Sequence, residues 1–519
     1  MKTLEEKDEK RGMSRRSILK GALAASALAA GGFALNLAKP GTAEAMVKKI
    51  PQKWDETWDV IVIGSGFAGL AAAAEAAGGG AKVVVLEKMP IYGGNSIING
   101  GLYASWDDKF HMRQKLNLGD DNPKLHADDT LKGGDYYNDP ALVKILAENA
   151  TDGLNWMMTE GGAAVRQTVL RTGGHSAYRT RTSGTGRTYT EALRKIAEKK
   201  GAKIILNNEV SWIWRKTADP KSPVLGLEVK RGKKVLNIKV LKAVVIASGG
   251  FSKDEKMRMA HYPMLTPDFK STNQPGATGE MIRFAQAIGA DTLQLNFIQL
   301  YPYADPETGV LDPPGLYPFN GPGAGIVYVT KKGKRFISEL ERRDRVTMIQ
   351  LNMGSSMKPT YSIFNEEMVP KLGGNMEEVA DGIKKGRFSV ADSVAELAGK
   401  IGMPANALVE TINKHNQYLA DGKDPEFNKP ITKAMIPMLK GPYYAVAQWP
   451  AVHHCMGGLR INTNAQVVDI FGAVIPKLYA AGEATGGVHG SNRLGSNAIP
   501  DCVVFGRVAG INAAKEKAV

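Results

Sequence analysis

Cysteine is nearly absent from this chain: only Cys455 and Cys502 occur in 519 residues. Neither belongs to a C-x-x-C-H motif, so the sequence excludes covalently attached c-type haem. Two thiols are also too few for the four ligands of an iron–sulfur cluster, or for a disulfide framework. Any one-electron relay to or from this chain must therefore belong to another protein.

Long apolar runs are also scarce, and the one candidate lies near the N-terminus. Residues 14–20 resemble the twin-arginine export signal, a mildly apolar stretch follows at residues 21–38, and residues 43–45 offer a small-x-small cleavage site. A membrane anchor is the alternative, but the stretch is only moderately hydrophobic. We therefore expect residues 1–45 to direct twin-arginine export to the periplasm, with no membrane span after cleavage. This pathway carries folded proteins, which suits a chain that binds its cofactor in the cytoplasm.

Acidic residues are outnumbered by basic ones. The chain has 67 Lys and Arg against 52 Asp and Glu, a net charge of +15, and removal of residues 1–45 leaves +12. The simplest interpretation is a solvated basic surface. The alternative is a positive field that steers acidic partners or carboxylate substrates. No basic run typical of nucleic-acid binding appears, so we expect no nucleic-acid partner.

An apolar strand, a glycine-rich turn and an Ala-rich helix follow one another at residues 60–77. Gly64 makes the tight turn, Gly66 lets backbone N–H groups approach a pyrophosphate, and Gly69 allows close helix–strand packing. Glu87 closes the next apolar strand, where a carboxylate can accept both ribose hydroxyls. The acid distinguishes this pattern from an ordinary strand–helix turn. The sequence therefore predicts a dinucleotide site.

The chain is too long for a single compact core. Residues 46–293 alternate apolar strands with helical patterns, and residues 445–519 return to that pattern. Between them, residues 294–444 open with a Pro/Gly-rich loop at 301–325 and include amphipathic helices such as 390–401. We predict an α/β fold: a Rossmann-like nucleotide-binding domain in two parts, interrupted by an inserted α+β capping domain.

Several further motifs occur in a fixed order along residues 58–515. They are residues 93–96, 247–251, 271–277, 333–336 with 343–344, 453–458 and 482–493. Together they resemble the flavoproteins of the fumarate reductase and succinate dehydrogenase superfamily, in particular the soluble periplasmic flavocytochrome c branch. The resemblance implies bound FAD, a cap over the flavin, and reduction of a C=C bond conjugated to a carboxylate.

The resemblance also implies which cofactor and partner to expect. The haem domain of the flavocytochromes is missing, which implies a separate multihaem c-type cytochrome as electron donor. Asn95 and Ser96 stand where the covalent branch has a histidine, so we predict non-covalent FAD. Glu483 is expected to accept ribityl hydroxyls. The expected cofactor-binding residues are Gly64, Gly66, Ala68, Gly69, Glu87, Lys88, Gly94, Asn95, Ser96, Gly100, Gly101, Val210, Ser248, Gly249, Gly250, Gly482, Glu483, Arg493, Ser496, Ala498 and Ile499.

Reduction of an unsaturated acid needs fixed cations and a proton donor near the flavin. By resemblance, Arg343 matches the arginine that delivers the proton, and because its free pKa is too high for an ordinary acid it must act as a relay. The alternative is a structural ion pair with Asp344 or Glu341. By resemblance, His454 and Arg493 match the pair that binds the substrate carboxylate. One of the adjacent histidines, 453 or 454, is expected to be structural, and no metal ion is expected.

The chain departs from the fumarate reductases where they bind a second carboxylate. Tyr301 replaces a histidine there, and residues 316–322 contain neither the acid nor the arginine of that family. An unpaired buried carboxylate is costly, so fumarate should be a poor substrate. We expect the cavity wall opposite the His454–Arg493 pair to be apolar and aromatic. Its expected residues are Tyr301, Tyr303, Tyr317, Pro318 and Phe319.

The candidate substrates can therefore be ranked from the most to the least expected. Small monocarboxylates of the methacrylate or acrylate type come first, urocanate or another aryl-acrylate second, and fumarate after these. A flavin desaturase and a non-catalytic flavin redox subunit are the other classes considered, and the His454–Arg493 pair and Arg343 respectively argue against them. Cys455 is interpreted as a small buried side chain, with a redox switch as the alternative.

Overall fold

The computed structural model describes residues 48–216, 219 and 221–518. The predicted export signal at residues 1–45 lies outside these described residues. The chain divides into two units, residues 1–50 and 51–519, and the account below concerns the second. None of the helices in the described ranges has the length and apolar character needed to cross a bilayer.

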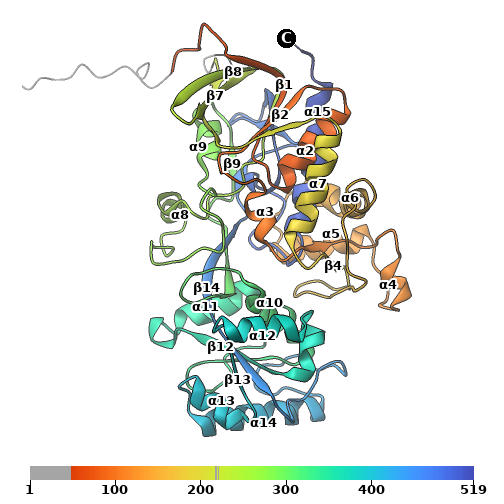
Figure 1. The fold of residues 1–519 in the computed structure, drawn as a ribbon, viewed down its shortest axis with the longest axis vertical. Helices are drawn as coiled ribbons and strands as arrows, with labels where there is room; N and C mark the ends of the chain where they lie inside the picture. The colour runs from red at the N-terminus through yellow and green to blue at the C-terminus, as the bar shows by residue number, and fades with distance from the viewer. Residues whose placement is uncertain (1–47, 217–218, 220, 519) are drawn as a thin grey trace, which may run out of the picture. The chain divides into compact units, whose positions relative to one another are not determined.

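An eight-stranded sheet with the order β16-β17-β8-β1-β2-β5 forms one half of this unit, and β7 joins β8 to β6 (Figure 1). The pairs β1–β2, β1–β8, β8–β17 and β2–β5 are parallel. The central segments are continuous buried apolar runs, as expected for strands covered on both faces. The strands are β1 (Glu56–Ile63), β2 (Val83–Leu86), β5 (Lys203–Ile205), β6 (Asn208–Arg215), β7 (Val224–Arg231), β8 (Lys234–Ile246), β16 (Gln466–Val468) and β17 (Val474–Ala480).

Helices α2 (Phe67–Gly78), α7 (Gly186–Lys199) and α15 (Ala498–Lys515) pack together beside this sheet (Figure 1). Small residues let α2 and α15 touch along their backbones. A Cβ at Gly506 would lie 2.4 Å from the Ala68 carbonyl oxygen, and one at Gly510 would lie 2.3 Å from that of Ala72. The start of α15 is thereby held close to the glycine turn that begins α2.

A second, five-stranded sheet is built by antiparallel pairs in the order β10-β14-β12-β11, with β13 on β14. Its strands are β10 (Ile298–Ala304), β11 (Val327–Val329), β12 (Thr360–Asn365), β13 (Phe388–Ala391) and β14 (Tyr443–Cys455). The helices that accompany it are α10 (Pro313–Asn320), α11 (Arg343–Asn352), α12 (Met376–Lys384), α13 (Val394–Lys400) and α14 (Ala405–Asp421).

Two local expectations for this region are wrong. The Pro/Gly-rich segment 301–325 is not a loop, because it contains the end of β10 and helix α10. Asp312 caps α10 by accepting a hydrogen bond from Gly315 N, and proline follows at the first helical position, where its missing N–H costs nothing. Residues 390–401 are not one helix either. They begin in β13, and α13 starts only after the Ser393 cap.

Strands β10 and β14 belong to both hydrophobic cores. Leu300 and Val452 lie in the core of the large sheet, whereas Tyr301 and Ala451 lie in the core of the second. The two strands therefore carry their own side chains from one core into the other. The α/β fold class is confirmed. The predicted domain boundary at 293/294 precedes β10, whereas the one at 444/445 falls inside β14. Both boundaries stay a prediction.

The remaining elements are the 20-residue helix α6 and shorter connecting segments. They are α3 (Gly94–Ile98), α4 (Met112–Lys115), α5 (Pro123–Gly133), α6 (Pro140–Thr159), α8 (Glu255–His261), α9 (Glu280–Ala287), β3 (Leu102–Ala104), β4 (Thr180–Thr182), β9 (Thr292–Leu293), β15 (Gly458–Leu459), and the 3-10 turns Pro322–Ala324, Ser355–Met357, Glu366–Leu372 and Gly482–Ala484.

Candidate active site

The turn between β1 and α2 has the geometry that its glycines predict. Gly64 has φ +100°, and a Cβ there would lie 2.4 Å from the Ala247 carbonyl oxygen. A Cβ at Gly69 would lie 1.9 Å from the Gly64 carbonyl oxygen. Both positions therefore exclude any side chain. The turn opens into a cavity, called here the first cavity, that continues along Glu87 and Ser248.

Glu87 lies at the end of β2 and is buried. Its Oε2 accepts hydrogen bonds from Ser65 N (3.1 Å) and Ser65 Oγ (2.6 Å), and its Oε1 accepts one from Met89 N (2.9 Å). A carboxylate has about four acceptor positions. Glu87 therefore anchors the glycine turn and keeps acceptor capacity toward the first cavity.

Twelve of the expected cofactor residues line the first cavity. They are Gly64, Gly66, Ala68, Glu87, Lys88, Gly94, Asn95, Ser96, Val210, Ser248, Gly249 and Glu483.

The opposite wall of the first cavity comes from the segment Gln274 to Met281. This wall was not predicted from the sequence, although residues 271–277 form one of the motifs. Lys88 connects the two walls, because its Nζ lies 2.5 Å from Thr278 Oγ1 and 2.9 Å from Glu280 Oε2. This segment carried no glycine fingerprint that would have identified it as a cavity wall.

A second cavity adjoins the first. It is lined by all four expected catalytic residues, Tyr301, Arg343, His454 and Arg493, and by Gly100, Ser496, Ala498 and Ile499 of the expected cofactor set. Phe67, Asn95, Ser96, Glu483 and Cys502 line both cavities. An extended dinucleotide held at the glycine turn can therefore reach from the first cavity into the second, and the residues present fit FAD.

Four expected cofactor residues line neither cavity. They are Gly69, Gly101, Gly250 and Gly482. Each packs against other parts of the chain. At Gly250 an added Cβ would lie 2.7 Å from Glu483 Oε1, and at Gly482 it would lie 2.9 Å from Cys502 Sγ. At Gly101 it would lie 2.6 Å from the Thr185 carbonyl carbon. These glycines permit close packing around the site instead of contact with a ligand in the cavities.

Arg343 begins helix α11 and points into the second cavity. Its Nη2 donates to the Arg493 carbonyl oxygen at 3.1 Å, and its guanidinium lies 5.2 Å from the centre of the Phe319 ring. Burial lowers its pKa. Among the described residues no carboxylate lies within ion-pair distance of it. The alternative ion pair is not formed, because Asp344 pairs with Arg342 and Glu341 pairs with Arg345.

Arg493 is the second cation of this cavity and is only 5% exposed. Its Nη2 donates to Gln299 Oε1 and its Nη1 to the Leu494 carbonyl oxygen, both at 3.0 Å. Its Nε is buried, and no partner for it occurs in the described part of the chain. Burial, followed by the charge of Arg343, lowers the pKa of Arg493 to about 9.

Glu483 is the one acid among the described residues that line the second cavity. It accepts a hydrogen bond from Cys455 N at 3.0 Å. Burial raises the pKa of Glu483 to about 7, so near neutral pH it offsets the two guanidinium charges only in part. An isolated buried charge is costly unless a partner of opposite charge is supplied. The second cavity is therefore suited to an anion.

A strand irregularity places two histidines on the same cavity. Gln299 pairs with His454, but the next residue of β10, Leu300, pairs with Val452, which leaves His453 as an extra residue. Successive side chains of a regular strand point to opposite faces, and such a bulge redirects one of them. Both histidines line the second cavity, so the expectation that one of them is only structural is not needed to explain their placement.

The two histidines have different partners. His453 Nδ1 lies 2.8 Å from Thr272 Oγ1, and its ring centre lies 5.0 Å from that of Tyr301. The Nδ1 of His454 is buried and has no partner among the described residues. Burial, followed by the charge of Arg493, lowers the pKa of both histidines well below its usual value. Both rings are therefore neutral at pH 7.

The wall opposite Arg493 is only partly as expected. Tyr301 and Phe319 line the second cavity together with Leu311 and Leu316, but Tyr303, Tyr317 and Pro318 do not. Tyr303 packs edge-on behind Tyr301, with ring centres 5.3 Å apart, and Tyr317 packs against Phe388 in the core of the second sheet. The Tyr301 hydroxyl donates to the Gly315 carbonyl oxygen at 2.8 Å. Tyr301 therefore presents its ring to the cavity, and its hydroxyl is already bonded.

Cys455 behaves as a buried structural side chain. It lines neither cavity, and its Sγ accepts a hydrogen bond from Phe251 N at 3.4 Å. Burial raises the pKa of this thiol well above its usual value. A protonated, enclosed thiol reacts slowly with oxidants, which favours the structural interpretation over the redox switch.

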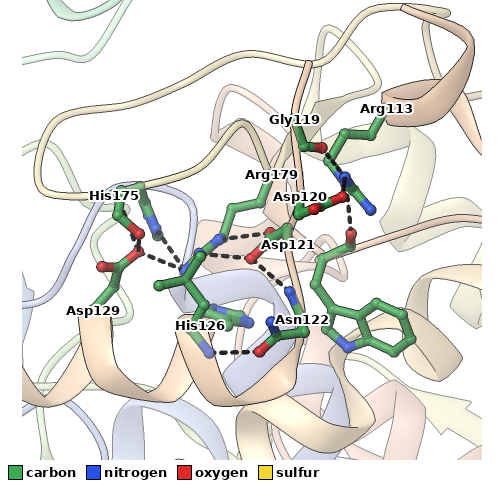
Figure 2. A network of polar contacts seen from close by, with 12 residues as sticks. Arg113, Gly119, Asp120, Asp121, Asn122, His126, Asp129, His175 and Arg179 are labelled. Carbon is green, nitrogen blue, oxygen red and sulfur yellow. Dashed lines mark hydrogen bonds and ion pairs between the residues drawn. The ribbon is translucent and has the colours of Figure 1, made fainter. Parts of the chain in front are cut away.

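A buried polar network supports the loop after Arg493, and sequence reasoning missed it (Figure 2). Arg179 pairs with Asp121 at 2.8 Å and Asp129 at 2.9 Å. His175 Nε2 lies 2.7 Å from the Gly495 carbonyl oxygen, and His126 Nε2 lies 3.0 Å from Asn497 Oδ1. Burial lowers the pKa of both histidines to about 3, so they act as neutral hydrogen-bonding groups.

Comparison with known proteins gives consistent matches. The FAD binding domain family matches residues 59–499. A fumarate reductase (cytochrome) of Shewanella frigidimarina is 37% identical over 472 residues, 89% of this chain and 77% of that protein. A urocanate reductase of Eggerthella lenta is 36% identical over 480 residues, 91% and 77% of the two chains. An acrylate reductase flavoprotein subunit of Shewanella woodyi is 34% identical over 513 residues, 96% and 97% of the two chains.

A solved structure supports the same assignment. The open conformation of a flavocytochrome c3 fumarate reductase aligns with a TM-score of 0.72 at 33% identity, covering 98% of this chain and 82% of that one. The predicted resemblance to fumarate reductase-type flavoproteins is confirmed, and so is FAD as the cofactor.

Proposed function

Because this chain belongs to the FAD binding domain family, we propose that it is an FAD-dependent oxidoreductase that reduces the C=C bond of an α,β-unsaturated carboxylate. The observation that carries this proposal is a pair of arginines, Arg343, which is partly buried, and Arg493, which is buried. They line one cavity, and neither has an ion-pair partner among the described residues. Electron storage alone would not require two such cations beside a flavin.

Bound FAD supplies the hydride, from flavin N5. The residues of the chain do the rest. Arg493 has an unused Nε donor, and His454 lines the same cavity, so together they bind the substrate carboxylate. Because negative charge moves toward the carboxylate during hydride transfer, a fixed guanidinium stabilises the transition state more than the ground state.

Arg343 delivers the proton to the α-carbon. Burial lowers its pKa and so brings it closer to an effective acid. It must regain a proton after each turnover. In the part of the chain that the structure describes, no acid is hydrogen-bonded to Arg343, so the proton does not come from a directly bonded carboxylate.

The apolar wall supports a small monocarboxylate, of the methacrylate or acrylate type, as first choice. The apolar part of the cavity lining includes the Tyr301 ring, Phe319, Leu311 and Leu316. None of these four side chains carries a charge that could pair with a second carboxylate, and the guanidinium that lies near Phe319 is that of Arg343, the proposed proton donor. Urocanate or another aryl-acrylate is the second candidate, favoured by the Tyr301–His453 pair, since a flat heteroaromatic ring can stack on one and hydrogen-bond to the other.

The remaining features of the proposal rest on sequence. The chain would be exported by the twin-arginine pathway to the periplasm and receive electrons from a separate multihaem c-type cytochrome. Its lack of a haem-attachment motif and its net charge of +12 without residues 1–45 support an external, acidic partner. Non-covalent FAD is supported by α3, which places Asn95 and Ser96 at both cavities and contains no histidine.

The test is anaerobic oxidation of reduced methyl viologen by the FAD-loaded protein with methacrylate, acrylate, crotonate, urocanate, cinnamate and fumarate. Fast turnover of a monocarboxylate or aryl-acrylate, with little turnover of fumarate, is expected. If fumarate is the best substrate, another residue holds the second carboxylate and the monocarboxylate assignment is wrong. If no enoate is reduced, the proposed activity is wrong.

A further inference from the structure

The turn at residues 133–138 contacts both segments that carry the arginines of the second cavity. Asp135 accepts two hydrogen bonds from Arg342, from Nη1 at 2.6 Å and from Nη2 at 2.9 Å. Arg342 immediately precedes Arg343 and occupies the N-cap position of α11, without a side-chain capping hydrogen bond. The ion pair therefore joins the turn at the end of α5 to the residue before a helix, 207 positions away.

The same turn is bonded to the segment before Arg493. The Ser491 hydroxyl donates to Asp135 Oδ2, and Ser491 N donates to the Gly134 carbonyl oxygen at 3.0 Å. Asn492, the residue before Arg493, donates through Nδ2 to the Gly133 carbonyl oxygen at 3.1 Å. One short turn thus holds the neighbour of each arginine.

The backbone of this turn is itself unusual. Asp135 and Tyr136 both have positive φ, 53° and 59°. This conformation is uncommon for residues other than glycine and persists only where the surroundings impose it, often at functional sites. Tyr136 is 72% exposed, so packing of its side chain does not explain the conformation. Asp135 N donates to the Lys132 carbonyl oxygen at 3.2 Å and Tyr136 N donates to that of Leu131 at 2.9 Å, which ties the turn to the end of α5. The bonds from Arg342 and Ser491 then hold the Asp135 carboxylate.

We propose that Asp135 is a positioning residue that sets the separation between Arg343 and Arg493. Its carboxylate binds Arg342 on one side and Ser491 on the other, and the contact that results is the 3.1 Å hydrogen bond from Arg343 to the Arg493 carbonyl. The inference rests on the proposed function, because it assigns the chemistry to those two arginines. Proton transfer requires the donor and the bound carboxylate to be correctly spaced, and an error of about 1 Å can cost about 10²-fold in rate.

The first test compares Asp135→Asn, Arg342→Gln and the double variant. Asparagine tolerates the left-handed backbone, and its one amide oxygen can still accept from Ser491, but the charge and one of the two oxygens that accept from Arg342 are lost. This pair is partly exposed, so we expect kcat to fall about tenfold with KM within about threefold. Each of these variants removes the Asp135–Arg342 ion pair, so the double variant should resemble Arg342→Gln, which also removes the Arg342–Asp344 ion pair. Ser491→Ala removes the hydroxyl that donates to Asp135 Oδ2 and should instead raise KM.

The matched controls are Glu341→Gln and Arg345→Gln. These residues form a partly exposed ion pair beside the start of the same helix, at 3.7 Å, and neither contacts the turn. Glutamine at position 341 keeps an oxygen that can accept from Arg342 N, as Glu341 does at 3.1 Å. Both variants should keep kcat within twofold of the unmodified protein. The inference is overturned if Asp135→Asn matches these controls, or if the double variant loses about a hundredfold, the product of two independent effects.

A second measurement does not depend on the substrate. Hydrogen exchange of the peptide that covers the start of α11 should be faster in Asp135→Asn and Arg342→Gln than in Glu341→Gln, while exchange in β1 and β8 stays unchanged. Unchanged exchange at α11 overturns the role of Asp135 even if the enzyme is active. If the unmodified protein reduces no enoate, the proposed function is overturned. If hydrogen exchange is nevertheless faster in the variants, Asp135 remains the residue that holds Arg342.

Discussion

Arg179 and Arg493 are both buried arginines, yet their surroundings are opposite. Arg179 is fully buried and lies within 3 Å of two carboxylates, Asp121 and Asp129 (Figure 2). Arg493 is 5% exposed and bonds only to neutral oxygens of Gln299 and Leu494. Burial is thus common to both arginines. The difference is the counterion, which the fold supplies to Arg179 and which, under the proposed function, the substrate carboxylate would supply to Arg493.

The same distinction separates Arg335 from Arg343. Arg335 is buried against Glu339 at 2.9 Å and Asp424 at 2.8 Å. Arg343 has no such partner among the described residues, although Asp344 and Glu341 adjoin it in sequence. Neighbouring acids are therefore a poor guide to pairing, since each of these two is bonded to a different arginine.

The largest expected effect is the loss of Arg343. Arg343→Ala should reduce enoate reduction by at least about 10³-fold, because proton delivery by a positioned group contributes roughly 10²–10⁴-fold and the charge is lost as well. Bound FAD, measured as flavin absorbance per protein, should be unchanged. Arg345→Ala on the exposed side of the same helix is the control. Retained activity in Arg343→Ala would contradict the proton-donor assignment.

The next effect is on stability and separates the two arginine classes. Arg179→Met leaves Asp121 and Asp129 without their partner and should lower the free energy of unfolding by about 3–5 kcal/mol. Arg493→Met removes a buried charge that has no carboxylate in an ion pair and that Glu483 offsets only in part, so the free energy of unfolding should be unchanged or higher. Urea unfolding of the FAD-loaded variants measures both. Equal destabilisation by the two substitutions would break the comparison.

Local sequence explains the parts of the site that depend on few neighbours. The glycine turn at 64–69 and Glu87 follow from an apolar strand, fixed spacing and the sterics of glycine. Tyr301 was correctly placed at the second cavity. Arg343, His454 and Arg493 also lie there, as the resemblance implies, but their roles stay a prediction.

The rest depends on contacts between distant segments. Arg179 is 58 positions from Asp121, and neither lies in a motif. The bulge at His453 exists only because β10 pairs with β14 across that register. Tyr303 and Tyr317 were expected in the cavity because they lie in the segments that match the second-carboxylate region of the fumarate reductases, yet they fill the core of the second sheet. Composition identifies an aromatic region, whereas pairing decides which rings face a ligand.

The pH dependence of kcat/KM gives a sharper test of Arg493. Its pKa is lowered to about 9, so the free enzyme carries this cation below pH 9 and loses it above. Because the substrate carboxylate is ionised throughout, kcat/KM should fall about tenfold per pH unit above pH 9, while kcat persists to higher pH because the bound anion favours the cation. Glu483, with a pKa of about 7, titrates separately at lower pH. A profile that is flat to pH 10.5 would contradict the assignment.

The smallest expected effect concerns the wall that lacks a charge. The Tyr301 hydroxyl is bonded to the Gly315 carbonyl, so it does not offer a donor to a second carboxylate. Tyr301→His places a donor there, and one hydrogen bond to a charged group contributes about 1.5–3 kcal/mol. The kcat/KM for fumarate, measured with reduced methyl viologen, should therefore rise by about tenfold. Tyr303→Phe removes only the hydroxyl of the ring that packs behind Tyr301, so the kcat/KM for fumarate should stay within twofold of the unmodified protein. If Tyr301→His leaves fumarate turnover unchanged, another residue excludes the second carboxylate. His453 is then the next residue to replace, because its ring centre lies 5.0 Å from that of Tyr301.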